Sequence, residues 1–378
     1  MRNGGCVVSR YIVIGAGILG AATAYHLAKL GADVVVVDRK DAGQATDAAA
    51  GMICPWLSQR RNKAWYRLAK KGAAYYPRLI KQLQDDEEQE TGYKQVGAIS
   101  IHTDIEKLKQ MEERARIRKE DAPEIGGITM LTEEETRNMF PLLKKGYASV
   151  YISGAARVNG RALRDALLRS AEKYGANIVN GSAALVSGNG TVQGVKVGKE
   201  LIAGDCVVIT AGAWADELLA PLGVRLLITY QKGQIVHLKL RNQLTDSWPV
   251  VMPPGDQSIL AFDGGEVVVG ATHENHTGFD LRVTAGGLHE IFSKAFEVAP
   301  GLQDGEVIDV RVGFRPFTPN FLPVIGEVPS YEGLYLANGL GASGLTMAPF
   351  LGSQLACLVT GREFEIDLAE YDIRGAIG

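Results

Sequence analysis

A short apolar stretch that runs into a glycine-rich turn constrains this chain more than any other segment. The residues Tyr11–Ile14 are apolar, and the turn Gly15–Gly20 follows them directly. The pattern then predicts a helix to about Leu30 and a second apolar strand, Val34–Val37, that ends at Asp38. Strand, turn, helix and strand in this order predict a βαβ unit.

Each glycine of the turn has a separate mechanical role. Gly15 permits the tight turn, Gly17 lets the backbone approach a pyrophosphate, and Gly20 lets the helix pack closely on the strand. The N-terminus of that helix attracts a diphosphate through its free N–H groups and its dipole. Asp38 falls 23 positions after Gly15, where a carboxylate accepts hydrogen bonds from a ribose. The unit therefore predicts dinucleotide binding, with a purely structural βαβ unit as the alternative.

Composition narrows the class of protein. The chain has 378 residues, enough for two domains with separate cores. It is 46% hydrophobic and 22% charged with a net charge of -3, an ordinary soluble profile that favours neither nucleic acid nor anionic membrane as a partner. The longest apolar runs are strand-sized, so we expect no integral membrane segment. The segment Met1–Arg10 has no apolar core of signal-peptide length, and we expect a cytoplasmic protein.

The four cysteines lie far apart and none forms a CxxC pair. This spacing argues against a metal site, a redox disulfide and a disulfide scaffold. We interpret Cys6, Cys54, Cys206 and Cys357 as thiols in a reducing compartment.

Alternating strands and helices are predicted near both ends of the chain. Between them lie two insertions of antiparallel strands and helices. Cys206–Thr210 is typical of a buried parallel strand, and Leu226–Thr272 alternates with Pro and Gly turns like an antiparallel sheet. Leu334–Ala337 returns to a strand before a helix that ends near Val359. We predict an α/β fold with a discontinuous, Rossmann-like nucleotide domain (10–90, 150–224 and 309–378) and an antiparallel-sheet cap domain (91–149 and 225–308).

Local patterns predict the remaining elements. Thr132 and Glu135 form a capping pattern, and Asn159 caps a helix that Gly175 ends. The expected helices are Trp56–Leu83, Ile105–Lys119, Thr132–Met139, Asn159–Tyr174 and Thr284–Phe296; the expected strands are Lys94–His102 and Asn177–Val179, with a hairpin turn at Ser187–Gly190.

A second GxGxxG, Gly339–Gly344, also lies between a strand and a helix. The chain ends too soon after it for another complete nucleotide-binding half, so a second dinucleotide site is disfavoured. We prefer a helix N-terminus aimed at the other end of the same cofactor, where its dipole would stabilise negative charge on a reduced flavin. The alternative is a glycine loop that only caps the helix.

Taken together, these motifs resemble the glycine oxidase and D-amino-acid oxidase/dehydrogenase family of FAD-dependent amine oxidoreductases. The matching segments occur in family order and cover nearly the whole chain: Gly15–Gly20, Asp38, Thr46–Met52, Thr210–Trp214, Val268–Thr272, Gly313–Pro316 and Leu345–Met347.

The resemblance implies noncovalent FAD in an extended form, because no cysteine sits in the kind of loop that tethers a flavin. Adenosine is expected near Asp38 and Arg39, with a backbone contact to the adenine from Ala184. The first domain would then bind FAD and the cap domain the substrate. The expected cofactor residues are Gly15, Gly17, Ile18, Leu19, Gly20, Asp38, Arg39, Thr46, Ala49, Ala50, Gly51, Met52, Ala184, Ala211, Gly212, Gly341, Ala342, Ser343, Gly344, Leu345 and Thr346; no metal is expected.

The resemblance also implies a substrate carboxylate held by Arg315, whose planar fork suits such a group. An internal pairing with Asp or Glu is the alternative. We assign the substrate site to Arg315, Met52, Ser258 and His273.

Two departures from glycine oxidases put glycine itself in doubt. Ala342 stands where they carry a second substrate-binding arginine, and Ser258 stands where they commonly carry a tyrosine. Either change makes room for a larger or secondary amine. Arg60 and Arg61 either replace the lost charge or begin a solvated helix. His273 and Glu274 either face the cavity or lie in a surface turn.

The implied reaction is oxidation of a small amino acid or a secondary amine carrying a carboxylate. Hydride transfer to flavin N5 gives an imine that hydrolyses, and oxygen or another acceptor then takes the electrons. Two alternatives stay open: a flavoprotein subunit of a larger dehydrogenase complex, and an NAD(P)H-dependent flavin enzyme. The sequence leaves homo-oligomer formation open.

Overall fold

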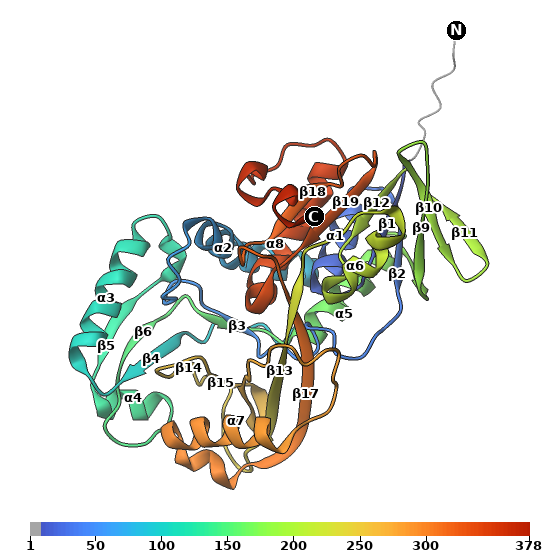
Figure 1. Cartoon of the computed structure of the whole chain (residues 1–378). Helices are drawn as coiled ribbons and strands as arrows, with labels where there is room; N and C mark the ends of the chain where they lie inside the picture. Colours follow the sequence, from blue (N-terminus) through green and yellow to red (C-terminus); the bar gives the residue numbers. More distant parts are fainter. Residues whose placement is uncertain (1–8) are drawn as a thin grey trace.

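The computed structural model describes residues 9–378, which form two lobes built on two large sheets (Figure 1). The expectations for Cys6 and for most of Met1–Arg10 fall outside the described residues. One lobe contains the first strand, the second glycine loop and the long helix after that loop, so segments far apart in the sequence lie in one unit.

The first lobe is built on a six-stranded sheet that is parallel except at β18. Its central strands are rich in Val and Ile and are buried on both faces, as expected for a sheet covered by helices. In sheet order the strands are β18 (Val324–Glu327), β19 (Leu334–Asn338), β12 (Cys206–Ile209), β1 (Arg10–Ile14), β2 (Asp33–Asp38) and β8 (Asn177–Asn180).

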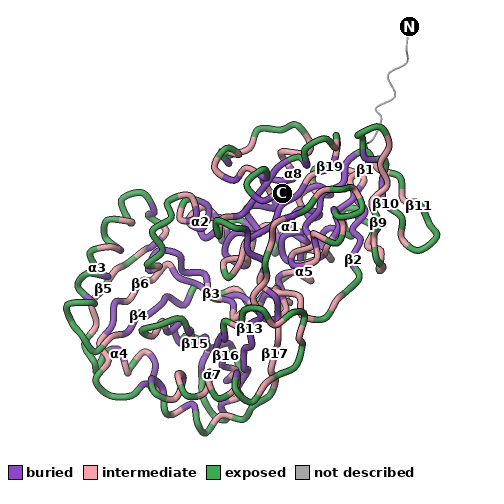
Figure 2. Tube along the Cα trace, in the orientation of Figure 1, coloured by how far each residue is buried: buried purple, intermediate pink, exposed green. Residues whose placement is uncertain are grey.

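Helices α1 (Ile18–Lys29), α5 (Gly160–Lys173) and α8 (Gly344–Val359) pack together beside this sheet, and α2 (Lys63–Asp85) packs on α8. Small residues allow the close approach of α1 and α8, since a Cβ on Gly352 would lie 2.6 Å from the Cβ of Ala22. Almost all of α1 is buried (Figure 2).

The C-terminal segment differs from the expectation that all apolar runs are strand-sized. Gly341–Val359 is long and apolar enough to cross a membrane by length and composition. However, 61% of this stretch is buried inside the molecule, where α8 packs on α1 and α2 as a core helix.

The second lobe is built on an eight-stranded, mostly antiparallel sheet with its own core. Helices α3 (Ile105–Lys119), α4 (Glu133–Met139) and α7 (Ala285–Val298) belong to this lobe. In sheet order the strands are β17 (Glu306–Phe317), β13 (Thr229–Lys239), β16 (Glu266–Gly270), β15 (Ser258–Ala261), β14 (Val250–Met252), β4 (Ala98–His102), β6 (Ala148–Ile152) and β5 (Ile128–Leu131).

Smaller elements complete the fold. The hairpin expected at Ser187–Gly190 joins β9 (Ala183–Gly188) to β10 (Thr191–Val197), and β11 (Glu200–Ala203) extends it. A two-stranded pair, β3 (Met52–Ile53) and β7 (Ala156–Arg157), and the short helix α6 (Ala215–Leu219) belong to the connecting segments.

Most local expectations are confirmed. The capping box at Thr132 is complete, with both Thr132 and Glu135 bonded to backbone N–H groups, and Asn159 caps α5. Two boundaries are wrong. The helix expected from Trp56 begins at Lys63, and the strand expected from Lys94 begins at Ala98. Trp56 is buried in an irregular segment, so its burial comes from tertiary packing and not from a helix face.

The expected domain limits at 150 and 309 cut through single strands. β6 pairs only within the eight-stranded sheet, and β17 pairs with β13 of that sheet and makes one further bridge, from Phe314 to Gln44. A division of the chain by sheets therefore moves these limits to the ends of β6 and β17. The reason is that β17 is one continuous strand, although its last residues carry the motif that we had assigned to the nucleotide domain.

Candidate active site

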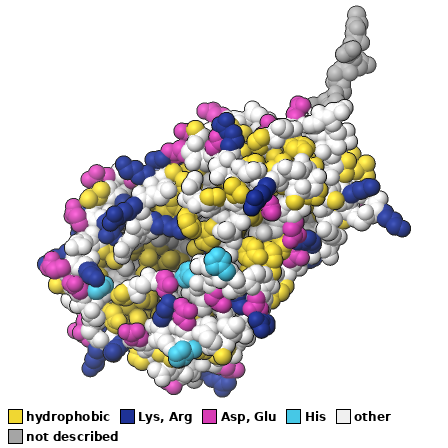
Figure 3. Space-filling view, in the orientation of Figure 1, with side chains coloured by type: hydrophobic (Ala, Val, Ile, Leu, Met, Phe, Trp, Pro, Cys, Tyr) yellow, Lys and Arg dark blue, Asp and Glu magenta, His cyan; other side chains and the backbone are white. Residues whose placement is uncertain are grey.

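A cavity of about 530 Å³ lies between elements of the two lobes. One part is lined by the ends of β1, β2 and β12 and by the first residues of α1 and α8; the other part is lined by β13, β15, β16 and β17. The molecular surface in Figure 3 is hollowed between the lobes, with hydrophobic side chains around the hollow. A cavity of this size accommodates a large organic ligand.

The glycine turn has the geometry that its motif predicts. Gly15 has a φ of +99°, and a Cβ there would lie 2.8 Å from the carbonyl oxygen of Thr210. A Cβ on Gly20 would overlap the carbonyl oxygen of Gly15 and lie 2.6 Å from Thr210 Oγ1. Gly20 does not line the cavity; its contribution is the close packing of α1 against the turn.

Asp38 ties the end of β2 to this turn and also lines the cavity. Its Oδ2 accepts a hydrogen bond from Ala16 N at 2.6 Å, and its Oδ1 accepts bonds from Lys40 N at 2.5 Å and Gln44 Nε2 at 3.2 Å. Arg39 also lines the cavity and pairs with Asp41 and Glu217. The acidic residue thus lies where a nucleotide ribose is expected.

The two helices that open at the cavity differ at their N-termini from the other helices of seven or more residues. The N-cap residues of α1 and α8, Gly17 and Ser343, have no side-chain cap bond, and neither helix has an acidic residue in its first turn. Side chains cap α2, α3, α4, α5 and α7, by Asn62, Asp104, Thr132, Asn159 and Thr284 respectively. Two positive helix ends are therefore left for an anionic or electron-rich ligand.

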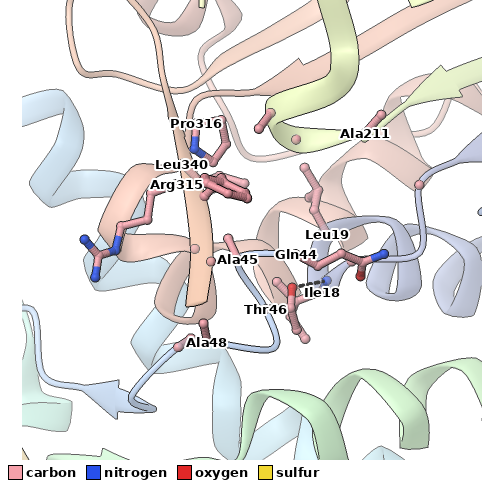
Figure 4. Close-up of a pocket in the computed structure, with 18 of the residues that line it drawn as sticks. Ile18, Leu19, Gln44, Ala45, Thr46, Ala48, Ala211, Arg315, Pro316 and Leu340 are labelled. Atoms are coloured by element: carbon pink, nitrogen blue, oxygen red, sulfur yellow. Dashed lines mark hydrogen bonds between the residues drawn. The ribbon is translucent and has the colours of Figure 1, made fainter. Parts of the chain in front are cut away.

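The segment after β2 passes close to both helix ends. Ile18 N donates to Thr46 Oγ1 at 3.0 Å (Figure 4), and Thr346 Oγ1 donates to Met52 O at 3.4 Å. Gly51 has a φ of +102°. A side chain there would overlap the carbonyl oxygen of Val158, so this residue must be glycine for the segment to follow the cavity wall.

The cavity brings together most of the cofactor residues expected from the sequence. Gly20, Ala184 and Ser343 are exceptions. Ala184 is exposed on β9, while its neighbours Gly181–Ala183 line the cavity, and Ser343 Oγ accepts a hydrogen bond from Trp65 Nε1. The expected residues on the wall are Gly15, Gly17, Ile18, Leu19, Asp38, Arg39, Thr46, Ala49, Ala50, Gly51, Met52, Ala211, Gly212, Gly341, Ala342, Gly344, Leu345 and Thr346.

Arg315 reaches the opposite part of the cavity from β17. Its Nη1 donates to Thr272 O at 3.0 Å and to Gln231 Oε1 at 3.2 Å. Among residues 9–378, no carboxylate lies within ion-pair distance of this guanidinium. Burial lowers the pKa of Arg315 to about 10, while the nearby Asp256 acts in the opposite direction. In Figure 4, Arg315 lies on one side of the view, and Ile18 and Thr46 lie on the other.

His273, Ser258 and Met52 also line the cavity. His273 Nδ1 lies 3.3 Å from Asp256 Oδ2, and Asp256 Oδ1 accepts a bond from Lys294 at 3.0 Å. Burial, and then the positive charge of Arg315, lower the pKa of His273. The imidazole is therefore neutral at pH 7.

Other candidates lie outside the cavity. Arg60 stacks over Trp65 and Arg61 is exposed, and neither lines the cavity. Glu274 turns away and bonds Gln234 and Thr272. Sequence reasoning missed Asp256 and Gln44 on the wall, because neither stands in a motif and only the fold brings them to it. Trp214, the last residue of the Thr210–Trp214 motif, also lines the wall, although no role was assigned to it.

A family model described as "DAO: FAD dependent oxidoreductase" matches residues 10–358. The chain belongs to this family. The chain is 63% identical over 368 residues to the "Uncharacterized oxidoreductase YurR" of Bacillus subtilis (strain 168), covering 97% of this chain and 99% of that one. It is 33% identical over 375 residues to the "Glycine oxidase" of Pseudomonas aeruginosa, again covering 97% and 99%.

Solved structures of the family agree with the fold. Iminodiacetate oxidase (IdaA) from Chelativorans sp. BNC1 is 44% identical, with a TM-score of 0.93 over 96% of this chain and 98% of that one. Glycine oxidase from Geobacillus kaustophilus is 26% identical, with a TM-score of 0.85 over 97% and 98%.

FAD, bound noncovalently, is therefore the cofactor of this oxidoreductase. The residues fit it: the uncapped N-terminus of α1 suits the pyrophosphate, Asp38 suits the ribose, and the N-terminus of α8 suits the flavin. Of the cysteines at residues 9–378, none lines the cavity.

Proposed function

We propose that this enzyme oxidises a small amine that carries a carboxylate: an N-substituted glycine, glycine or a D-amino acid. The observation that carries the proposal is Arg315. It lines the cavity, its hydrogen-bond partners are neutral oxygens, and no carboxylate neutralises it among the described residues.

A largely buried cation without a partner is unfavourable unless a ligand supplies the opposite charge. The pKa of Arg315 stays well above neutral even after burial lowers it to about 10, so the guanidinium is charged at pH 7. Its planar fork can hold a carboxylate through two parallel hydrogen bonds. Arg315 would thereby fix the distance and orientation of the substrate's α-carbon.

Within this class, the residues favour a substituted nitrogen. Ala342 and Ser258 are small, both line the cavity, and each stands where a larger side chain is expected in glycine oxidases. Space is then left around the amine for a substituent. The likeness to an iminodiacetate oxidase, whose substrate name denotes a secondary amine, supports the same preference.

Bound FAD would accept a hydride from the α-carbon. The chain's own residues have other tasks. Arg315 orients the carboxylate, Met52 and Leu340 give the wall apolar surface that excludes water, and the neutral His273 can accept a hydrogen bond from the substrate's amino group. The product imine then hydrolyses without further help from the protein.

Anaerobic mixing of the purified flavoprotein with glycine, D-alanine, N-methylglycine and iminodiacetate tests the proposal. Loss of the flavin absorbance identifies a donor without any assumption about the electron acceptor. We expect N-methylglycine or iminodiacetate to bleach the flavin faster than glycine does. If none of the four bleaches it, the proposed function is wrong. Turnover of the isolated chain with oxygen, compared with an artificial acceptor, then separates an oxidase from a dehydrogenase.

A further inference from the structure

Strand β13 has two faces with separate tasks. Because side chains alternate along a strand, Gln231 and Gly233 lie on one face, and Lys232 and Gln234 lie on the other. The first face contacts Arg315. Gln231 Oε1 accepts a hydrogen bond from Arg315 Nη1, and any side chain on Gly233 would overlap the Arg315 guanidinium. Strands β13 and β17 run side by side (Figure 1).

The second face holds the segment that connects β16 to α7. We call residues 272–284 the clamped segment. It has no regular secondary structure over this length, yet its two ends and its middle are all bonded to β13. Two fully buried side chains, Lys232 and Gln234, make most of its side-chain bonds to β13, and Gln231 Nε2 adds one to Asn275 Oδ1 at 3.0 Å.

Lys232 bonds the middle of the clamped segment. Its Nζ donates to Arg282 O at 2.8 Å and to Asp280 Oδ2 at 3.2 Å, and Glu274 Oε2 lies 3.7 Å away. Its backbone N–H and C=O pair with Glu274, each at 2.9 Å. A lysine that is 0% exposed is rare unless its charge is paired, as it is here.

Gln234 bonds both ends of the clamped segment. Its Nε2 donates to Glu274 Oε1 at 2.7 Å and to Thr284 Oγ1 at 3.0 Å, and its Oε1 accepts from Thr284 N at 3.0 Å. Its backbone N–H donates to Thr272 Oγ1 at 2.9 Å. A side chain on Gly287 would overlap the Gln234 amide, so helix α7 also leaves room for it.

The clamped segment begins at the residue that orients Arg315. Thr272 O accepts the hydrogen bond from Arg315 Nη1, and the next residue, His273, lines the cavity. A shift of the clamped segment away from β13 would therefore move an acceptor of the guanidinium and a wall of the substrate site together.

We propose that Lys232 and Gln234 are positioning residues. They hold the clamped segment in place. Thr272 O and Gln231 Oε1 then orient the Arg315 guanidinium toward the substrate carboxylate. This inference rests on the proposed function of Arg315. Neither residue touches the substrate; both act through the clamped segment.

The test replaces the ammonium with an apolar chain of similar length, Lys232→Met. Methoxyacetate, the ether analogue of N-methylglycine, is titrated into the FAD-loaded enzyme, and the flavin absorbance reports binding. Because a displacement of about 1 Å can cost about 10²-fold, we expect Kd to rise about 10- to 100-fold. The kcat for N-methylglycine at saturation should change less than about threefold, because the interaction lost is one of binding. Lys239→Met, on the same strand but bonded to Gly264 O, is the matched control and should leave Kd unchanged.

Two further measurements separate positioning from general destabilisation. In an Arg315→Met background, Lys232→Met should leave methoxyacetate binding within about twofold, because residues that act as a unit are not additive. Hydrogen exchange of the clamped segment should accelerate at least about tenfold in Lys232→Met, while the six-stranded sheet keeps its protection. If Lys232→Met does not fold, the same tests are made with Gln234→Leu. This variant keeps the lysine.

The outcomes are distinguishable. An unchanged Kd, an additive double variant or an unchanged exchange rate of the clamped segment would each overturn the positioning role. A wild-type enzyme that binds no methoxyacetate and is bleached by no carboxylated amine would instead overturn the proposed function, and the role toward Arg315 with it. Equal loss of protection over the whole molecule would show a merely structural role.

Discussion

The nucleotide end of the cavity is built from main chain, whereas the substrate end is built from side chains. At the first, the backbone of the Gly15–Gly20 turn and the N-termini of α1 and α8 face the ligand, and glycines keep side chains away from it. At the second, Arg315, His273 and Ser258 come from three different segments, and Thr272 O and Gln231 Oε1 hold the Arg315 guanidinium through hydrogen bonds.

The two ends of the cavity tolerate different substitutions. A main-chain site fails by steric overlap, because an added atom meets rigid backbone. A side-chain site fails by loss of charge or by displacement, and the fold can survive or even gain stability.

Gly20→Ala should have the largest effect. The added Cβ would overlap Gly15 O and lie 2.6 Å from Thr210 Oγ1, so α1 must move away from the turn. Overpacking of this kind costs about 1–3 kcal/mol or more, and we expect loss of bound FAD together with a lower Tm. Flavin absorbance per protein and thermal unfolding measure both. Gly286→Ala, where nothing lies within 4 Å of the new atom, is the control and should retain FAD. Full FAD content in Gly20→Ala would contradict the claim that close backbone packing at the glycine turn is needed to bind FAD.

Arg315→Met should abolish function while it spares the fold. We expect the Kd of methoxyacetate to rise by about 10²-fold or more, because the charge-assisted hydrogen bonds from the guanidinium to the carboxylate are lost. Folding stability should rise by ~1 kcal/mol, because a buried charge without a carboxylate partner is removed. Arg311→Met, on the same strand but paired with Asp309, should leave binding unchanged. Equal affinity of the wild type and Arg315→Met would show that the carboxylate binds elsewhere.

The affinity for a carboxylate should change with pH as the charge of Arg315 does. Burial lowers its pKa to about 10, so the group is charged below this pH and loses its charge above it. The methoxyacetate carboxylate stays ionised throughout, so its affinity should be flat from about pH 7 to 9 and then fall up to tenfold per pH unit above the pKa. Titration of the flavin absorbance at each pH measures this. A fall that begins near neutral pH would assign binding to another group.

Gly17→Ala should have the smallest effect on the protein itself. The new Cβ would lie 3.4 Å from Thr46 Oγ1, an ordinary contact, so the Tm of the FAD-free protein should change little. The added methyl group nevertheless stands where the pyrophosphate is expected, and FAD affinity should fall about tenfold. Equilibrium dialysis with FAD measures the affinity. Unchanged affinity would mean that the cofactor does not approach Gly17.

The same contrast explains how much the sequence could predict. The nucleotide end follows from one contiguous segment with fixed spacing, so the βαβ unit, the roles of Gly15 and Gly20 and the helix after Gly344 were all predicted. The backbone contact of Ala184 with the adenine stays a prediction, and Ala184 lies on β9 directly after Ala183 of the cavity wall.

The substrate end could be predicted only where a motif marks it. Arg315 was found through its GFRP context, but Asp256 and Gln231 are ordinary polar residues until the sheet brings them near the guanidinium. Lys232 is the clearest case. A lysine in a strand of alternating pattern is predicted to be exposed. In the structure Lys232 is completely buried under residues 42 to 50 positions away in the sequence.

The bare ends of α1 and α8 have a consequence for how the enzyme accumulates in a cell. Both lack the side-chain caps that the other long helices carry, so without the nucleotide fewer N–H groups of their first turns are bonded, although Ile18 N keeps its bond to Thr46 Oγ1. Loading with flavin nucleotide completes these helices and shifts the folding equilibrium by mass action. The steady-state amount of enzyme should then follow the supply of vitamin B2, since empty chains open more often and meet proteases sooner.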